Sequence, residues 1–68
     1  MTSIYIGNLG ASITETELRT QLETYGRVNR VYMCHDFAVI GMEDESAAKR
    51  AITDLNGRTT WFLREYPS

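Results

Sequence analysis

Apolar residues follow two different spacings in the first third of the chain. Residues 4–9 alternate apolar and other side chains at a period of two, which is typical of a β-strand. Further along, Leu18, Leu22 and Tyr25 recur at helical spacing. The pattern therefore predicts a strand over 4–9 and a helix over 14–25 that buries one apolar face.

Both ends of this helix carry sequence signals. Thr14 is followed three residues later by Glu17, and this spacing lets each side chain accept a hydrogen bond from a free backbone N–H of the first turn. Gly26 follows the last apolar position and is expected to end the helix in a left-handed conformation.

Two further strands are predicted in the middle of the chain, over 28–34 and 37–42. Only His35 and Asp36 separate them, so a tight turn is expected. The resulting hairpin has a very short connection.

A second helix is expected to begin after Asp44, whose side chain can cap it, and to run to about Leu55. Asn56 and Gly57 are predicted to stop it. The residues expected to form its buried stripe are Ala48, Ala51, Ile52 and Leu55.

A fourth strand is predicted over 61–66, with Pro67 ending it. The order β-α-β-β-α-β is that of a ferredoxin-like sandwich in the α+β class. This fold has a four-stranded antiparallel sheet, and both helices must cover the same face to bury their single apolar stripes. The other sheet face is then open to solvent, and in so small a chain it is the expected place for function.

Strand alternation assigns side chains to that open face. The residues expected to point outward are Tyr5, Gly7, Arg30, Tyr32, Phe37, Val39 and Gly41. If Leu63 points inward, Phe62 and Arg64 join them. Aromatic rings on an exposed sheet can stack on nucleobases, and neighbouring arginines can reach phosphates.

Composition limits the alternatives. The chain has 68 residues, which is enough for one small domain, expected over 1–68. Its single cysteine, Cys34, excludes an internal disulfide and a multi-cysteine metal site, and no cofactor is expected. Apolar runs are too short to cross a membrane. The single cysteine and the absence of a signal peptide lead us to expect an intracellular protein, cytoplasmic or nuclear.

Charge is distributed unevenly. The net charge of −2 does not by itself indicate a nucleic-acid partner. The helical segments carry seven acidic and three basic residues, whereas strands and loops, with Arg58 counted among them, carry four basic and two acidic ones. The sheet side is therefore expected to be mildly basic even though the net charge of the whole chain is negative.

The chain resembles the RNA recognition motif family, in its short-loop form, over nearly its whole length. Residues 4–9 match the short ribonucleoprotein motif, with Tyr5 as its aromatic. Residues 35–42 resemble the long motif, whose pattern is K/R-G-F/Y-G/A-F-V-x-F/Y. Residues 14–19 and 48–57 match the two helices of the family.

The resemblance implies binding of single-stranded RNA on the sheet face, with Tyr5 and Phe37 stacking on adjacent bases. Arg30, Tyr32 and Arg64 would flank the two rings. The sequence also departs from the family pattern: Val39 stands where a third ring is usual, and His35 takes the place of the basic first residue. Both are retained as expected RNA contacts, but binding should be modest and dependent on salt.

Alternatives remain open at this point. The pair of Tyr5 and Phe37 could serve sheet stability alone, and Tyr32 could be an ordinary edge-strand tyrosine. The domain could instead be a protein-interaction module with little RNA binding, docking a peptide or a second copy of itself. An exposed edge of the fourth strand would offer one such docking site. No catalytic constellation is present, so an enzyme is not expected, and neither a metal nor a membrane partner is.

Overall fold

The structure is a computed structural model that describes residues 1–66, so Pro67, which was predicted to end the last strand, lies outside the described residues. The predicted βαββαβ order is confirmed. The elements are β1 (Thr2–Gly7), α1 (Glu15–Glu23), β2 (Val28–Met33), β3 (Phe37–Met42), α2 (Glu45–Arg58) and β4 (Phe62–Glu65).

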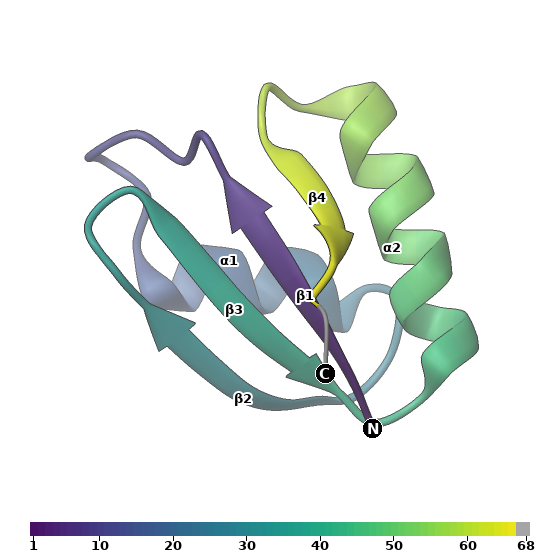
Figure 1. The fold of residues 1–68 in the computed structure, drawn as a ribbon. Helices are drawn as coiled ribbons and strands as arrows, with labels where there is room; N and C mark the ends of the chain where they lie inside the picture. Colours follow the sequence, from purple (N-terminus) through teal and green to yellow (C-terminus); the bar gives the residue numbers. More distant parts are fainter. Residues whose placement is uncertain (67–68) are drawn as a thin grey trace.

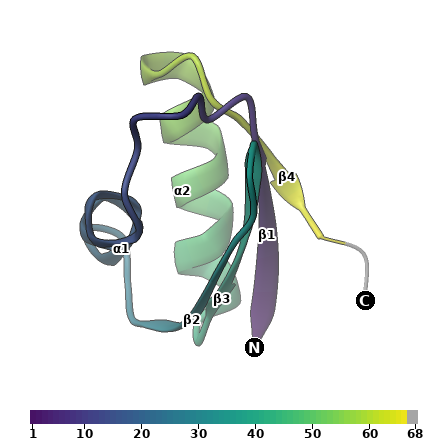
Figure 2. The same cartoon turned by 90° about the vertical axis from the view of Figure 1, so that its left-hand side faces the viewer.

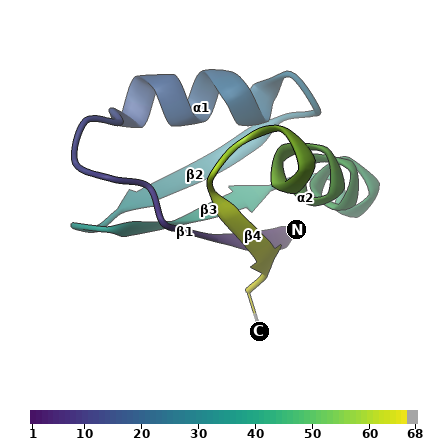
Figure 3. The ribbon, with the colours of Figure 1, turned by 90° about the horizontal axis from the view of Figure 1, so that it is seen from above.

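The strands form one antiparallel sheet in the order β2-β3-β1-β4, so β1 and β3 are central (Figure 1). Figure 2 shows the sheet nearly edge-on, with both helices on the same side. The view from above in Figure 3 shows the same two layers, with the second face of the sheet uncovered. The predicted ferredoxin-like class is therefore confirmed.

The inner face of the sheet and the facing sides of the helices form the core. On the inner face of the sheet, the buried strand residues are Ile4, Ile6, Ala38, Ile40, Met42 and Leu63. Val31 and Met33, on the face of β2 opposite Arg30 and Tyr32, are only partly buried because β2 is an edge strand. From α2, Ala47, Ala48, Ala51 and Leu55 are buried, whereas Ile52 is only partly so. A helix face built mostly of alanine allows α2 to approach its neighbours closely.

The predicted capping box of α1 is present. The Thr14 hydroxyl accepts from the Glu17 amide at 3.1 Å, and the Glu17 carboxylate accepts from the Thr14 amide at 3.1 Å. The helix ends at Glu23, two residues before the predicted end at Tyr25.

The expected left-handed stop at Gly26 is wrong. Among residues 1–66, Gly10 is the glycine with a positive φ. A Cβ atom on Gly26 would instead lie only 2.6 Å from the Cβ of Ala47. Glycine stands here because the connection between α1 and β2 passes directly against α2.

The predicted stop of α2 at Asn56 and Gly57 is also wrong, since the helix continues to Arg58. The Asn56 side chain is used elsewhere: its Nδ2 donates to the Leu63 carbonyl at 2.8 Å, and its Oδ1 accepts from the Leu63 amide at 2.8 Å. Thr59 caps the helix instead, with its amide donating to the Leu55 carbonyl at 3.0 Å.

The two hydrogen bonds between Asn56 and Leu63, called the Asn56 clamp below, affect the exposed edge of β4. Leu63 directs both of its backbone polar groups away from β1, and Asn56 occupies both. Two residues earlier, just before β4 begins, the Trp61 amide donates to the Thr59 hydroxyl at 3.1 Å. The Asn56 side chain therefore closes the β4 edge at Leu63, which removes part of the edge that was expected to be open to another chain. The strand is also shorter than predicted, at Phe62–Glu65.

The remaining strand boundaries shift by one or two residues. β1 begins at Thr2 and ends at Gly7 because Asn8 adopts a φ of 61°, which leaves the strand conformation. The Asn8 side chain then donates to the Thr60 carbonyl at 2.9 Å. β2 ends at Met33, and the predicted tight turn is confirmed by the Cys34 amide, which donates to the Phe37 carbonyl at 2.9 Å.

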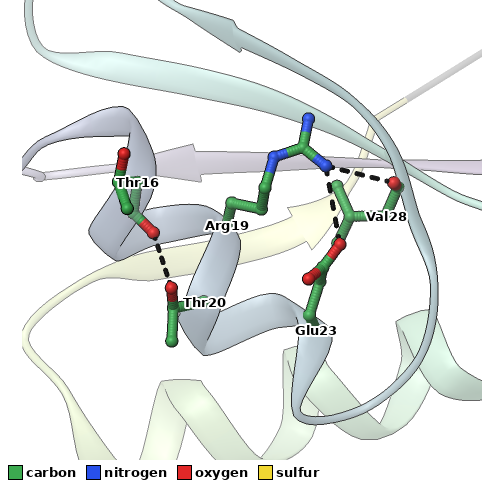
Figure 4. Close-up of polar contacts among 5 residues, drawn as sticks. All are labelled: Thr16, Arg19, Thr20, Glu23 and Val28. Atoms are coloured by element: carbon green, nitrogen blue, oxygen red, sulfur yellow. Dashed lines mark hydrogen bonds and ion pairs between the residues drawn. The ribbon is translucent and has the colours of Figure 1, made fainter.

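Two polar side chains of α1, Arg19 and Thr20, make hydrogen bonds within the helix and to the start of β2 (Figure 4). Arg19 donates to the Val28 carbonyl at 3.4 Å and lies 3.5 Å from the Glu23 carboxylate, so it joins α1 to the start of β2. The Thr20 hydroxyl donates to the Thr16 carbonyl one turn earlier, at 2.8 Å.

Within residues 1–66, neither helix combines the length and the apolar character that crossing a membrane would need.

Candidate nucleic-acid interface

The outer sheet face is organised in three rows that cross the strands, as the register dictates. The first row consists of Phe37, Gly7 and Phe62. The second row consists of Tyr32, Val39, Tyr5 and Arg64. The third row consists of Arg30, Gly41 and Ser3, and is extended by Tyr66, whose amide donates to the Ser3 carbonyl at 2.9 Å.

Two aromatic rings meet at the centre of this face. The rings of Tyr5 and Phe37 are stacked, with centroids 5.6 Å apart and planes at 25°. The Tyr5 ring lies over Gly7, where a Cβ atom would be only 3.0 Å from the ring. Glycine at this position therefore lets the tyrosine ring lie against the sheet.

Two β4 side chains belong to the same face on the other side of β1. The guanidinium carbon of Arg64 lies 5.0 Å from the centroid of the Tyr5 ring, within reach of a cation–π interaction. Phe62 stands opposite Gly7 and is 54% exposed. The burial of Leu63, at 2% exposed, confirms the condition under which both residues were expected to point outward.

On the β2 side, the face becomes more open. Tyr32 is 63% exposed, and its neighbour in the row, Val39, is half-buried. Arg30 is exposed and lies opposite Gly41. Tyr32 and Val39 both line the hollow described below.

His35 is the one predicted site residue that the rows do not include. It lies in the turn between β2 and β3, where its side chain is exposed. Although His35 is the first residue of the long motif, it does not lie on the sheet face, so it would contact RNA from the turn rather than by stacking on the sheet.

Of the third row, sequence reasoning singled out Arg30 as a site residue and placed Gly41 outward, but it did not find the space beside them. A shallow hollow of about 410 Å³ lies there. Its lining residues are Met1, Ser3, Arg30, Tyr32, Phe37, Val39, Gly41 and Tyr66. Met1, Ser3 and Tyr66 were absent from the expected site, although the alternation that placed Arg64 outward also places Tyr66 outward, two residues later.

Exposed large apolar side chains gather on this one face. Within residues 1–66, those with the greatest exposure are Met1, Tyr32, Phe62 and Tyr66. All four belong to the rows or to the hollow. A concentration of this kind on one surface is a sign of a binding site.

The arginines of this face also differ from the cations of the helices. The ion pairs found in the described part of the chain involve Arg19, Lys49 and Arg58, all on helices. Arg58 lies in α2 rather than in a loop, which corrects the predicted charge division by moving one positive charge to the helical side. Arg30 and Arg64 have no carboxylate partner among residues 1–66, so their donors are available to a ligand.

The opposite side of the molecule holds a polar network, whose residues Tyr25, Asp54 and Arg58 also line an open hollow of about 670 Å³. The Tyr25 hydroxyl donates to the Asp54 carboxylate, and Arg58 lies 3.6 Å from the same carboxylate. The hydrogen bond to Asp54, with smaller contributions from burial and from the negative charge, raises the pKa of Tyr25 above its ordinary value of 10.0. Arg50 donates to the Tyr25 carbonyl at 3.1 Å, so the network joins α2 to the segment after α1.

The described residues were also compared with the requirements of a metal site. Over residues 1–66, no three His, Cys, Asp or Glu side chains lie together in a way that could hold a metal ion.

Comparison with known proteins identifies the family to which the chain belongs. A sequence profile of the RNA recognition motif matches residues 4–62, which is most of the chain. The chain belongs to the RNA recognition motif family. The family is one of binding domains rather than of enzymes, which agrees with the expectation that this RNA recognition motif has no catalytic activity.

Relatives and solved structures agree with this assignment. The chain is 30% identical over 68 residues to the serine/arginine-rich splicing factor RSZ22A of Arabidopsis thaliana, covering 96% of this chain and 35% of that protein. It is 36% identical over 56 residues to human RNA-binding protein 4B, covering 82% of this chain and 16% of that protein. It therefore spans about a third or less of these relatives. The crystal structure of RNA Binding Protein PG1 superposes with a TM-score of 0.93 at 28% identity, over 100% of this chain and 96% of that one.

Proposed function

We propose that this RNA recognition motif binds single-stranded RNA on its outer sheet face, with the rings of Tyr5 and Phe37 stacking on neighbouring bases. The observation that carries the proposal is the stacked pair itself, at 5.6 Å, on a face that no helix covers. Stacking on aromatic side chains is how sequence-tolerant and sequence-specific readers of single strands hold bases.

The surroundings of the pair support the same function. Arg64 lies over Tyr5, and Arg30 stands at the β2 side of the face, so cations without carboxylate partners among residues 1–66 flank the rings. Tyr32 and Val39 continue the surface toward β2, while His35 stands at its end. These residues would contact phosphates, sugars or additional bases, and an intracellular location remains a prediction that accompanies this role.

Relatives give independent support. Human RNA-binding protein 4B and the splicing factor RSZ22A, to which this chain is similar, are named for RNA-directed roles. A peptide-docking or self-associating module is the competing function. Its version based on the β4 edge is weakened because Asn56 occupies the backbone groups of Leu63, and no other observation favours it over RNA.

The test compares Tyr5→Ala/Phe37→Ala with the wild-type domain. We expect the double substitution to lower affinity for a random-sequence single-stranded RNA pool by at least about tenfold, because each stacked base is worth about 1–3 kcal/mol. Affinity is measured by following backbone amide shifts as RNA is added at low salt. Tyr5→Phe retains a ring and should retain binding, so it is the matched control.

Two results would contradict the proposal in different ways. A folded double variant that binds RNA as well as the wild type would reject the stacking site. A wild-type domain whose amide shifts do not move at low salt and high RNA concentration would reject RNA binding and favour a protein-interaction module.

A further inference from the structure

The two edges of the sheet are protected to different extents. β2 and β4 are the edge strands, and the Asn56 clamp occupies both outward backbone groups of Leu63 on β4 (Figure 1). On β2, protection is confined to the start of the strand. There Arg19 donates to the Val28 carbonyl at 3.4 Å, and the register shifts between Val28 and Arg30. A shift of this kind is a β-bulge, a device by which edge strands block pairing with other chains.

The rest of β2 presents unpaired backbone groups. The Cys34 amide donates to the Phe37 carbonyl, so in the antiparallel ladder the backbone groups of Tyr32, two residues earlier, also face β3. The residues on either side of Tyr32, which are Val31 and Met33, then direct their amides and carbonyls away from the sheet. Among residues 1–66, no hydrogen bond is found on these four groups.

The side chains at this edge are incompletely covered as well. Val31 and Met33 pack against the core on the inner face but are only partly buried. Tyr32 is 63% exposed on the outer face. Arg30 is the one charged residue of the segment 30–33, and it belongs to the outer face, so no charge protects the inner side of this edge.

We propose that segment 30–33 of β2 pairs antiparallel with the same segment of a second copy of this chain, around a two-fold axis at Tyr32. In this register, Val31 is the hydrogen-bonded partner of Met33 of the second copy, and Met33 is the partner of Val31 there. All four free backbone groups of each copy are then satisfied. The apolar side chains meet on the inner face, and the two Tyr32 rings meet on the outer face, where cross-strand pairs of these kinds are stabilising.

The sequence of β2 favours this register over its neighbour. Placing Val31 opposite Val31 of the second copy would set Met33 against Asn29, which lies in the bulge. It would also bring the two Arg30 side chains within diagonal reach, where like charges repel. In the register centred on Tyr32, the two arginines are offset by four residues, or about 13 Å. The segment is therefore complementary to itself, which is why a second copy is the partner that it fits.

The pairing would join the two sheets into one. Because both Tyr32 side chains lie on the same face, the two-fold axis runs perpendicular to the sheet, and the outer faces of the two copies become continuous. Each half carries its own stacked pair of Tyr5 and Phe37. The pairing goes beyond the proposed function and does not depend on it, so it is tested without RNA.

Disulfide trapping tests the register. Tyr32→Cys/Cys34→Ser places two thiols at directly opposed positions of a non-hydrogen-bonded pair, where the Cα atoms lie about 4.5 Å apart, within disulfide range. Under mild oxidation, this variant should form a covalent dimer at least about tenfold faster than Arg30→Cys/Cys34→Ser. The second variant is the matched control, because its cysteines lie on the same face of the same strand but are offset by about 13 Å in the pair.

A proline tests the backbone pairing. Val31→Pro should fold, since proline is tolerated on an edge strand where the N–H faces solvent, but it removes one donor from each copy. Sedimentation equilibrium up to about 1 mM protein measures the association, which should be weak because the paired segments are short. We expect the dissociation constant to rise at least about tenfold, since two backbone hydrogen bonds are lost. Val31→Thr keeps the amide and nearly the same shape, and it should associate as the wild type does.

A measurement on the wild type covers the case in which Val31→Pro does not fold. Hydrogen exchange at the amides of Val31 and Met33 should slow as the protein concentration rises, and exchange that does not depend on concentration overturns the proposal. Equal trapping rates in the two cysteine variants also overturn it, as does a wild-type domain that remains monomeric up to about 1 mM. Association that persists unchanged in a folded Val31→Pro variant places the interface elsewhere and rejects the β2 edge.

Discussion

The two faces of this domain use charge and glycine in opposite ways. On the helical side, each ion pair joins residues four apart on one helix, and Arg19 and Arg50 also bind backbone carbonyls of neighbouring segments. On the outer sheet face, Arg30 and Arg64 have no carboxylate partner in the part of the chain that the structure describes. The cations of the helical side named above have partners within the domain, whereas the outer face keeps two arginines without carboxylate partners and several rings exposed.

The glycines show the same contrast. Gly26 allows two backbone segments of the helical side to touch, since its Cβ would lie 2.6 Å from Ala47. Gly7 and Gly41 shape the outer sheet face instead, because the Tyr5 ring lies over Gly7 and Gly41 lines the hollow. Substitutions on the helical side should therefore change stability, and substitutions on the sheet face should change RNA affinity.

The largest effect is expected from Gly26→Ala. The added methyl group would overlap the Cβ of Ala47, and neither backbone can move easily, so we expect a loss of about 1–3 kcal/mol in the free energy of unfolding. Urea denaturation provides the measurement. RNA affinity of the folded fraction should not change.

Gly57→Ala is the control for this prediction. It adds the same methyl group to a helical position with open space, and it should stabilise the domain by about 0.5–1 kcal/mol because alanine favours helix. Opposite signs in the two variants would sharpen the contrast between packed and open glycines. Loss of stability in both variants would show that the contact with Ala47 is not the cause.

The clamp on β4 gives the next effect. Asn56→Ala leaves the amide and carbonyl of Leu63 without their partners, and an unsatisfied buried group costs about 1–3 kcal/mol. Thermal unfolding measures the destabilisation. Asn56→Asp keeps the acceptor for the Leu63 amide but loses the donor, so its stability should lie between those of the wild type and the alanine variant. An alanine variant as stable as the wild type would mean that water replaces the clamp.

These cases also show how far the sequence could predict the fold. Local rules identified what depends on neighbouring residues: the alternation of β1 and β3, and the capping box at Thr14 and Glu17. They failed at Asn56 and Gly26, where the residue serves a contact with another element. An asparagine that clamps a strand seven residues away looks, in sequence, like one that stops a helix.

The candidate site also has a part that the local sequence predicts and a part that depends on contacts between elements. The outward positions of Tyr5, Phe37, Tyr32 and Arg64 follow from period-two alternation. The hollow depends on which short residues become partners across strands, as Gly41 and Ser3 do, and that register is set by the folded sheet. The sequence could therefore predict which aromatic side chains point outward, but it could not predict the hollow beside Ser3 and Gly41.

A smaller effect is expected from the arginines. Arg30→Gln/Arg64→Gln should reduce the slope of log affinity against log salt by about 0.7 for each phosphate of the single strand that an arginine no longer neutralises. The matched control, Lys49→Gln/Arg58→Gln, changes net charge equally on the helical side, where both cations are ion-paired. Fluorescence anisotropy at several salt concentrations makes the comparison. Equal slopes in both double variants would show that overall charge, and not the sheet face, governs binding.

The smallest effect concerns the Tyr25 hydroxyl, in the network on the helical side. Tyr25→Phe removes the hydrogen bond to Asp54, and we expect a loss of about 0.5–1.5 kcal/mol near neutral pH, with RNA affinity unchanged. Because folding raises the pKa of this tyrosine, the neutral hydroxyl is favoured in the folded state. The stabilisation is then complete below the ordinary pKa of 10.0 and is lost as the pH rises through the higher folded value. Thermal unfolding between neutral and alkaline pH should show the wild-type advantage over Tyr25→Phe shrinking at the alkaline end, whereas an advantage that stayed constant would mean that the hydroxyl does not titrate differently in the folded and unfolded chains.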